Sequence, residues 1–206
     1  MKPMFCEEAC RIVAGIAKED VVVITMSTMK VFPGIAPKAN FVTCVPLMGG
    51  SASLGLGLAT ARPDIRVWVL DGDASLLMEL GSLVTVAEAM PRNLVHLVFN
   101  NRVQYGGTAN LASPRAGAVD FCGMARAAGY PMAVEIDSAE TMQATLSTLP
   151  RDAGPVFGNV RIEPDPGYYT EATPQREIPD AQITRMGDEA RRLRQVLQSI
   201  AVHQAR

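Results

Sequence analysis

Residues 69–75 read Val69-Leu70-Asp71-Gly72-Asp73-Ala74-Ser75, and 25 residues separate Ala74 from a second polar pair, Asn100-Asn101. Each group directly follows a short apolar run, 66–70 and 94–99, of the kind that forms a buried strand. The carboxyl ends of neighbouring parallel strands share one edge of a sheet, where ligands gather. The sequence therefore predicts that both polar groups contribute to a single ligand site.

The chemistry of these residues suits a metal ion together with a diphosphate. The Asp73 carboxylate and an Asn100 or Asn101 amide oxygen, with a backbone carbonyl nearby, are the hard oxygen ligands that Mg²⁺ prefers. A helix is expected from Leu76 to about Met90, capped by Ser75 or Asp73, and its free N–H groups favour a phosphate. The alternative is structural: Asp73 is only a helix cap and Asn100 only a turn residue.

The rest of the chain alternates between helical and strand patterns. Helices are predicted at 4–18, 51–61, 119–128 and 139–149, and further strands at 21–24, 132–136 and 155–162. Residues 26–50 carry several prolines and glycines and are expected to be irregular. Strand–helix alternation with strands buried on both faces predicts an α/β fold, a doubly wound parallel sheet with helices on both faces.

The composition of the chain changes near residue 163. Residues 1–163 are expected to form one domain, and residues 164–206 a Pro-rich linker followed by an amphipathic C-terminal helix at about 181–203. The cluster Arg191, Arg192 and Arg194 is preceded by acidic residues, so a solvated helix face is favoured over an anion site.

Composition excludes several classes of function. The 206 residues carry a net charge of −2, which gives no support for a nucleic-acid surface. No apolar run approaches the length needed to span a bilayer, and the N-terminus lacks a secretory pattern, so a cytoplasmic protein is expected. Cys6 and Cys10 lie one helical turn apart in apolar surroundings and are interpreted as buried thiols rather than metal ligands.

Gly72-Asp73-Ala74 followed by Asn100-Asn101 resembles the diphosphate-binding motif of thiamine-diphosphate enzymes, which reads Gly-Asp-Gly and then Asn-Asn. The segment 48–59 (MGGSASLGLGLA) is similar to the one that precedes this motif in the 2-oxoacid decarboxylases of that superfamily. Over residues 5–163 the chain resembles the sulfopyruvate decarboxylase beta subunit and the C-terminal half of phosphonopyruvate decarboxylase. The resemblance implies the thiamine-diphosphate-binding fold, with the diphosphate-binding (PP-type) domain on this chain.

The resemblance also assigns roles to individual residues. It implies thiamine diphosphate and Mg²⁺ as cofactors, with the metal held by the side chains of Asp73 and Asn101 and the carbonyl of Val103. It places Met48 under the cofactor, where it imposes a bent shape. The cofactor-binding residues it implies are Met48, Gly49, Gly72, Asp73, Ala74, Ser75, Asn101 and Val103.

Two segments depart from the relatives. Ala74 replaces the third glycine of the motif, so a backbone conformation open only to glycine is not required there. Residues 25–32 lack the Gly and Ser-Arg that relatives often place near cofactor and substrate, and leave Ser27, Thr28 or Lys30 as stand-ins.

The function expected from this resemblance is that of a beta-type subunit of a heteromeric enzyme that decarboxylates a 2-oxoacid. A separate pyrimidine-binding subunit would supply the activating glutamate in an α₂β₂ or larger assembly, and the catalytic residues of this chain are left unassigned. Two alternatives stay open: a carboligase subunit and a noncatalytic scaffold. A plain nucleotide-binding module is disfavoured because residues 25–28 form no Gly-rich phosphate loop.

The remaining chemically interesting residues have simpler interpretations. His96 and Trp68 lie in apolar strands and are expected in the core. Tyr105 is equally consistent with substrate contact and loop packing, and Glu79 with a surface and a functional position. Lys30, Arg102 and Arg115 are the cations near predicted strand ends and are the candidates to hold a second anionic group of a substrate. None of them matches a family position, and we expect that no such group is required.

Overall fold

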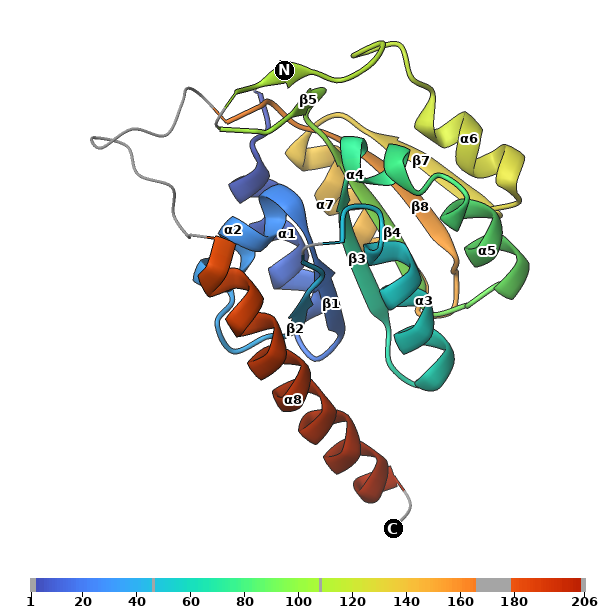
Figure 1. Cartoon of the computed structure of the whole chain (residues 1–206). Helices are drawn as coiled ribbons and strands as arrows, with labels where there is room; N and C mark the ends of the chain where they lie inside the picture. Colours follow the sequence, from blue (N-terminus) through green and yellow to red (C-terminus); the bar gives the residue numbers. More distant parts are fainter. Residues whose placement is uncertain (1–2, 46, 108, 166–178, 205–206) are drawn as a thin grey trace.

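A computed structural model describes residues 3–45, 47–107, 109–165 and 179–204. Its centre is a six-stranded parallel sheet in the order β2-β1-β3-β4-β8-β7 (Figure 1). The strands are β1 (Val21–Ile24), β2 (Asn40–Thr43), β3 (Val67–Gly72), β4 (Leu94–Asn100), β7 (Met132–Ile136) and β8 (Val156–Arg161). A separate antiparallel pair, β5 (Val103–Gln104) and β6 (Leu111–Ala112), lies in the loop after β4. The predicted fold class is confirmed.

The strand order reverses between β1 and β3, which fixes where a ligand can bind. From β1 the chain moves outward to β2, and then returns past β1 to β3 and β4. Helices leave β1 and β3 toward opposite faces of the sheet, so a crevice opens outside the carboxyl ends of these two strands. Those ends are Ile24 and Gly72, and Gly72 belongs to the predicted motif.

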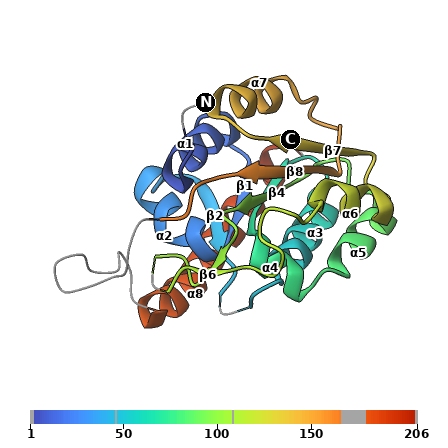
Figure 2. The same ribbon diagram turned by 90° about the horizontal axis from the view of Figure 1, so that it is seen from above.

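Helices cover both faces of the sheet, as Figure 2 shows from above. One face carries α1 (Cys6–Ala17), α2 (Met26–Ile35) and α7 (Ala139–Thr148). The other carries α3 (Ser51–Ala61), α5 (Ser82–Ala89) and α6 (Phe121–Ala128). Two further helices are the short α4 (Asp73–Met78), directly after β3, and the long C-terminal α8 (Pro179–Gln204).

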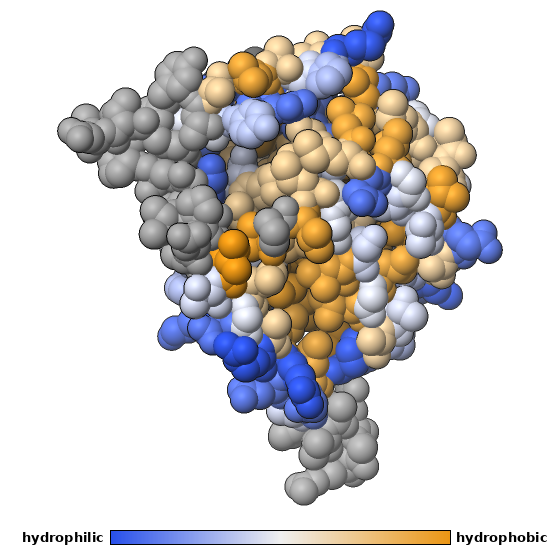
Figure 3. All heavy atoms as spheres, in the orientation of Figure 1, coloured by the Kyte–Doolittle hydropathy of each residue, from blue (hydrophilic) through white to orange (hydrophobic). Residues whose placement is uncertain are grey.

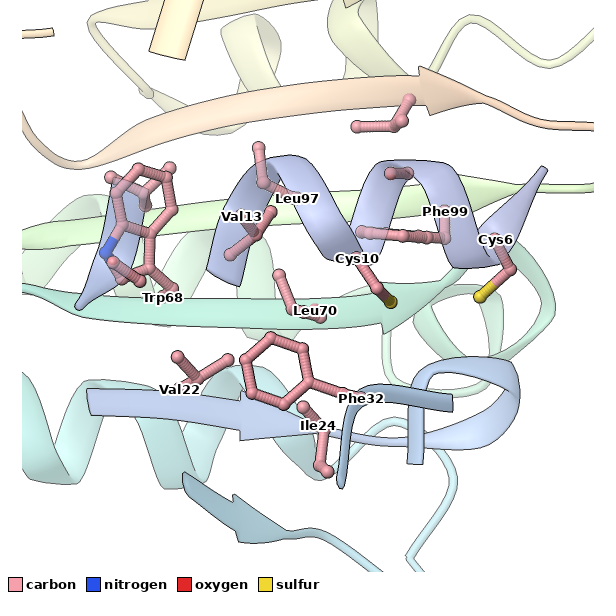
Figure 4. Close-up of a cluster of buried hydrophobic side chains, with 14 of the residues drawn as sticks. Cys6, Cys10, Val13, Val22, Ile24, Phe32, Trp68, Leu70, Leu97 and Phe99 are labelled. Atoms are coloured by element: carbon pink, nitrogen blue, oxygen red, sulfur yellow. The ribbon is translucent and has the colours of Figure 1, made fainter. Parts of the chain in front are cut away.

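Alternate side chains of each central strand enter two different cores. Val22, Trp68 and Leu70 face α1 and α2 in the cluster drawn in Figure 4, whereas Val67 and Val69 face α3 and α5. Because both faces are buried, the strands need continuous apolar runs rather than alternation, which is the pattern read from the sequence. Trp68 is fully buried, as predicted, and its Nε1 donates to Asp20 Oδ2 at 3.0 Å.

The cysteines contribute to these cores as thiols. All four are free and buried, and Cys6 and Cys10 lie on the face of α1 that packs on the sheet (Figure 4). Within the described part of the chain, no group of three or more His, Cys, Asp and Glu side chains is placed to hold a metal ion. The expectation of buried thiols at Cys6 and Cys10 is confirmed.

The prediction that residues 26–50 are irregular was wrong, because they contain α2 and β2. Pro33 lies inside α2 and has no N–H to donate to the carbonyl of Met29. Arg185 of α8 donates to that carbonyl instead, with Nη2 at 3.2 Å. A distant cation therefore satisfies the acceptor that the proline leaves without a helical partner, and no local pattern predicts this.

The single helix predicted from Leu76 to Met90 was also wrong. The chain forms α4 from Asp73 and a second helix, α5, from Ser82, with a break at residues 79–81. Met90 ends α5 in the left-handed conformation, with φ +46°, directly before Pro91. The short α4 begins at Asp73, so the motif carboxylate stands in the first turn of a helix.

The C-terminal helix packs on this chain's own sheet. Glu189 Oε2 accepts from the backbone N–H of Thr43 at 2.7 Å, and Arg192 donates to the carbonyls of Pro37 and Ala39. Leu193 enters the core beside α3. The helix thus covers the open edge at β2, an edge that otherwise invites pairing with another chain.

Two further expectations concern this C-terminal region. Arg192 binds backbone carbonyls rather than being merely solvated, while Arg191 pairs with Asp188 on the exposed side. Most of the predicted Pro-rich linker, residues 166–178, lies outside the described residues. None of the helices among the described residues is both long enough and apolar enough to cross a membrane.

Candidate functional site

A cavity of about 440 Å³ lies at the carboxyl ends of β1 and β3, where the strand order reverses. Seven of the eight residues predicted to bind the cofactor line it: Met48, Gly72, Asp73, Ala74, Ser75, Asn101 and Val103. The eighth, Gly49, is bonded to the same group, because its N–H donates to Ser75 Oγ at 2.8 Å. Three segments far apart in the sequence therefore meet at one cavity.

Asp73 connects the two halves of the motif. Its Oδ2 accepts from the backbone N–H of Arg102 at 3.1 Å and from Ser113 Oγ at 3.3 Å. The side chain is 3% exposed. These bonds hold the loop after β4 against the turn after β3, so the carboxylate lies where a metal ion would have to bridge the two segments.

Burial governs the charge of Asp73. Desolvation raises the pKa of this carboxyl above its ordinary value, and hydrogen bonds from Ala74, Ser113 and Arg102 offset part of that effect. The chain alone thus penalises the negative charge that it places at the cavity. A cation bound there would reverse the penalty, which is how metal-ligating carboxylates commonly behave.

Asn101 and Val103 are arranged in one turn beside Asp73. The Asn101 amide oxygen accepts from the Val103 N–H at 3.1 Å, and the Asn101 side chain is buried. An amide oxygen has two lone pairs, so one acceptor position is compatible with this bond and another with a cation. The turn brings Asn101 and the backbone of Val103 to the wall of the cavity.

Gly49 has the conformation that only glycine adopts without strain. Its φ is +89°, and a Cβ there would lie 2.2 Å from Cγ of Glu79. The turn at Gly49 presents Met48 to the cavity and directs the Gly49 N–H to Ser75. Glu79 is exposed and covers Gly49, so its position is that of a packing neighbour on the surface.

The donor set fits a divalent cation carrying a diphosphate. One carboxylate, one amide oxygen and one backbone carbonyl supply hard oxygen ligands from the chain. Ala74 and Ser75 lie in the first turn of α4 and are buried, with backbone N–H groups of the kind that binds phosphate oxygens. Ala74 has an ordinary helical backbone, so the missing third glycine leaves the turn intact.

The start of α2 forms one wall of the cavity, and the three candidate stand-ins Ser27, Thr28 and Lys30 all line it. Met26 lines the cavity with φ +51°, and its Cβ lies 3.6 Å from the position that a Cβ on Gly72 would take. Thr25 and Thr28 form a reciprocal capping box around Met26, and the Thr28 hydroxyl also donates to Leu70 O. The spacing of Thr25 and Thr28 is the one signal that predicts a helix start here.

The candidate cations differ in position. Lys30 lines the cavity, and burial of its ammonium group lowers its pKa, with Asp165 opposing this effect. Arg102 turns its guanidinium to both carboxylate oxygens of Glu163 at 3.0 Å. Arg115 is not among the residues that line the cavity. Of the described lining residues, Lys30 is therefore the only cation.

The structure also gives the positions of His96 and Tyr105. His96 is fully buried in β4, as expected for a core histidine. Tyr105 lines the cavity, where its side chain is 67% exposed, so it is available to a bound molecule. Gln104 and Gly106 line the same wall, and no sequence signal distinguished them from the rest of the loop.

The fold and the site together define a class: a parallel α/β domain that binds a diphosphate cofactor at the point where the strand order reverses. Residues 23–160 match the family described as "Thiamine pyrophosphate enzyme, C-terminal TPP binding domain". The chain belongs to this family. It is a thiamine-pyrophosphate-binding domain related to the sulfopyruvate decarboxylase beta subunit.

Two relatives illustrate the relationship. The sulfopyruvate decarboxylase subunit beta of Methanothermobacter thermautotrophicus is 33% identical over 162 residues, which cover 76% of this chain and 81% of that protein. Phosphonopyruvate decarboxylase of Streptomyces viridochromogenes is 42% identical over 124 residues, 58% of this chain but only 30% of that protein. The chain thus spans about a third of the phosphonopyruvate decarboxylases that it matches.

Solved structures share the fold at lower identity. The thiamine diphosphate-dependent 4-hydroxybenzoylformate decarboxylase of Rhodococcus jostii RHA1 superimposes with a TM-score of 0.63 at 19% identity. The match covers 79% of this chain and 33% of that chain. At this identity the likeness concerns the fold alone.

Proposed function

We propose that this chain is the beta-type, diphosphate-binding subunit of a heteromeric enzyme that decarboxylates a 2-oxoacid. The observation that carries the proposal is the meeting of Met48, Asp73, Ser75 and Asn101 at one cavity in a chain of this family. Thiamine diphosphate, when bound, would supply the electron-accepting chemistry that loss of CO₂ from a 2-oxoacid requires.

In this proposal the chain's own residues bind the cofactor and its metal ion and determine the conformation of the cofactor. Asp73, Asn101 and the carbonyl of Val103 hold Mg²⁺, and the N–H groups of Ala74 and Ser75 hold diphosphate oxygens. Met48 presents an apolar side chain that supports the bent cofactor. Apolar lining residues, including Val45, Met78 and Phe99, limit water around the reacting centre.

A separate pyrimidine-binding subunit completes the site in this proposal. The sulfopyruvate decarboxylase relative, which this chain matches over most of its length, is itself a beta subunit. Large apolar side chains stay exposed at Leu47, Met78 and Val84, with exposed fractions of 65%, 56% and 60%. Figure 3 shows apolar side chains gathered on the face that carries α3 and α4. Such a surface is typical of an interface. We propose an α₂β₂ or larger assembly.

Carboligation is the second candidate within the same chemistry. The same residues would hold the cofactor for a reaction in which the substrate is joined to an acceptor carbonyl instead of being released with a proton. The open wall formed by Gln104 and Tyr105 gives space for an acceptor. A noncatalytic scaffold is disfavoured, because a scaffold has no need of a buried carboxylate whose charge the chain alone penalises.

The test is calorimetric titration of the full chain with thiamine diphosphate, with and without Mg²⁺, followed by turnover assays on a panel of 2-oxoacids. We expect Mg²⁺-dependent binding by the chain and decarboxylation only when the pyrimidine-binding subunit is co-expressed. Product analysis with an added aldehyde separates carboligation from decarboxylation. Absence of Mg²⁺-dependent binding, alone and in the complex, would refute the cofactor site. Robust turnover by the isolated chain would refute the need for a partner.

A further inference from the structure

Three buried polar side chains form a hydrogen-bonded network that ends at Gly72, at the end of β3. The Tyr130 hydroxyl lies 3.3 Å from His96 Nδ1, and His96 Nε2 lies 3.4 Å from Asp71 Oδ2. Asp71 Oδ1 accepts from the backbone N–H of Gly72 at 2.8 Å. His96 and Asp71 are fully buried and Tyr130 is 3% exposed. This hydrogen-bonded network therefore extends from Tyr130, just after α6, to Gly72, the last residue of β3.

A His96 ring that carries its proton on Nε2 satisfies every group in this hydrogen-bonded network. Burial, reinforced by the charge of Asp71, raises the pKa of Tyr130, so the residue stays a phenol that donates to Nδ1. His96 then carries its proton on Nε2 and donates to Asp71 Oδ2. The second carboxylate oxygen is left to accept the Gly72 N–H. Each donor in the network then has an acceptor: Tyr130 donates to His96, and both His96 and the Gly72 N–H donate to Asp71.

Packing alone does not account for these residues. Phe157 contacts both rings edge-on, with ring centroids 5.4 Å from His96 and 5.8 Å from Tyr130. Apolar residues of similar shape would fill such a cluster without the cost of burying a carboxylate and an imidazole. Buried polar chains that are fully satisfied hold a unique geometry. The geometry held here is that of Gly72, the residue directly before Asp73.

We propose that Tyr130, His96 and Asp71 are positioning residues, which fix the Gly72 amide and thereby the turn that carries Asp73 at the metal position. The inference rests on the proposed function, because Asp73 matters there as a metal ligand. None of the three acts on substrate. Their effect is exerted through the backbone at Gly72, which lines the cavity together with Asp71.

The experiment compares four variants of the full chain. His96→Phe keeps an aromatic ring but removes both bonds, whereas His96→Gln keeps a donor toward Asp71. Tyr130→Phe removes only the outer bond and serves if His96→Phe fails to fold. Phe157→Leu is the matched control, because it loosens the same cluster and leaves the polar chain intact. The measurements are the melting temperature, the Gly72 amide signal of glycine-labelled protein by NMR, and Mg²⁺-dependent binding of thiamine diphosphate.

We expect His96→Phe to shift the Gly72 signal and to weaken Mg²⁺-dependent binding by about 10-fold, the size of a lost supporting contact at a metal site. Tyr130→Phe should weaken binding by about 3-fold, and His96→Gln should bind nearly as the wild type does. Phe157→Leu should lower the melting temperature without either effect. An unchanged Gly72 signal in His96→Phe, or an equal loss of binding in Phe157→Leu, would overturn the positioning role. Failure of the wild-type chain to bind would instead refute the proposed function.

Discussion

Replacing Asp73 by Asn should stabilise the metal-free chain while removing its capacity to bind Mg²⁺ and thiamine diphosphate. Asn has nearly the same shape and keeps an oxygen that accepts from Arg102 N–H and Ser113 Oγ. The difference is the charge. Because burial raises the pKa of Asp73 despite its hydrogen bonds, the folded chain disfavours the charged carboxylate more than the unfolded chain does. The neutral amide removes that penalty.

The size of the gain follows from the burial of a single carboxylate. Relief of a partly compensated buried charge is worth about 1 kcal/mol. For a chain of this size, 1 kcal/mol corresponds to a rise in melting temperature of about 2–4 °C. The loss in cofactor affinity should be about 100-fold, or ~3 kcal/mol, because one negative charge beside a dication disappears.

The pH dependence gives the sign of the effect. A carboxyl whose pKa is raised on folding binds its proton more tightly in the folded state, so the wild-type chain loses stability as pH rises from the unfolded pKa, about 3.9, through the folded value. The advantage of Asp73→Asn should therefore vanish at acidic pH, where both chains are neutral at this position. It should reach its maximum above the folded pKa.

The assay is thermal unfolding in the presence of a chelator, over a pH series, with calorimetric cofactor titration at neutral pH. Asp152→Asn is the control, because the Asp152 side chain is 68% exposed and pairs with Arg92, and neither residue lines the cavity. A destabilised Asp73→Asn chain at neutral pH would refute the argument from burial. Undiminished Mg²⁺-dependent binding would refute the assignment of Asp73 as a metal ligand.

Three more outcomes are expected. Met48→Leu should retain activity in the assembled enzyme while Met48→Ala lowers kcat more than cofactor affinity, as measured by steady-state kinetics and titration; equal activity would make Met48 an ordinary packing residue. Gly49→Ala should cost about 2 kcal/mol in the free energy of unfolding, because φ is +89° and the new Cβ meets Glu79; a denaturant titration that shows no loss would contradict this. Pyruvate-type substrates should be accepted without a second anionic group, since Lys30 alone among the described lining residues is cationic; strict dependence on a phosphonate or sulfonate in the turnover assay would exclude the idea.

Periodicity and spacing were sufficient for five of the six strands of the central sheet, and β2 was missed. The runs at Val67–Leu70 and Leu94–Phe99 are apolar on both faces, so the sequence identified them as buried parallel strands, and the motif residues after them met at one cavity. The break between α4 and α5 was missed, because Gly81 is tolerated in many helices and the apolar pattern continues through it.

Other features could not be predicted because their causes are far apart in sequence. Pro33 argues against a helix locally, whereas in the structure Arg185 donates to the carbonyl of Met29 that Pro33 leaves without a helical donor. His96 has the pattern of a core residue, and its bonds to Asp71 and Tyr130 join positions 25 and 34 residues away. Patterns in a single sequence indicate which face of a helix or strand is apolar and how motif residues are spaced. These contacts instead join residues that come together only when the core is folded.

The position of α8 narrows where a partner can dock. Glu189 accepts from the Thr43 N–H of β2, and Arg192 binds the carbonyls of Pro37 and Ala39 just before this strand. Because α8 packs along β2, another chain would have to displace the helix to extend the sheet there. The cavity opens elsewhere, at the carboxyl ends of β1 and β3, and the exposed Leu47 and Met78 lie on segments that also carry the lining residue Met48 and the motif helix. A subunit that completes the cofactor site must cover that end of the sheet. It would bury the apolar residues beside the cavity, and the edge at β2 would stay closed by the chain itself.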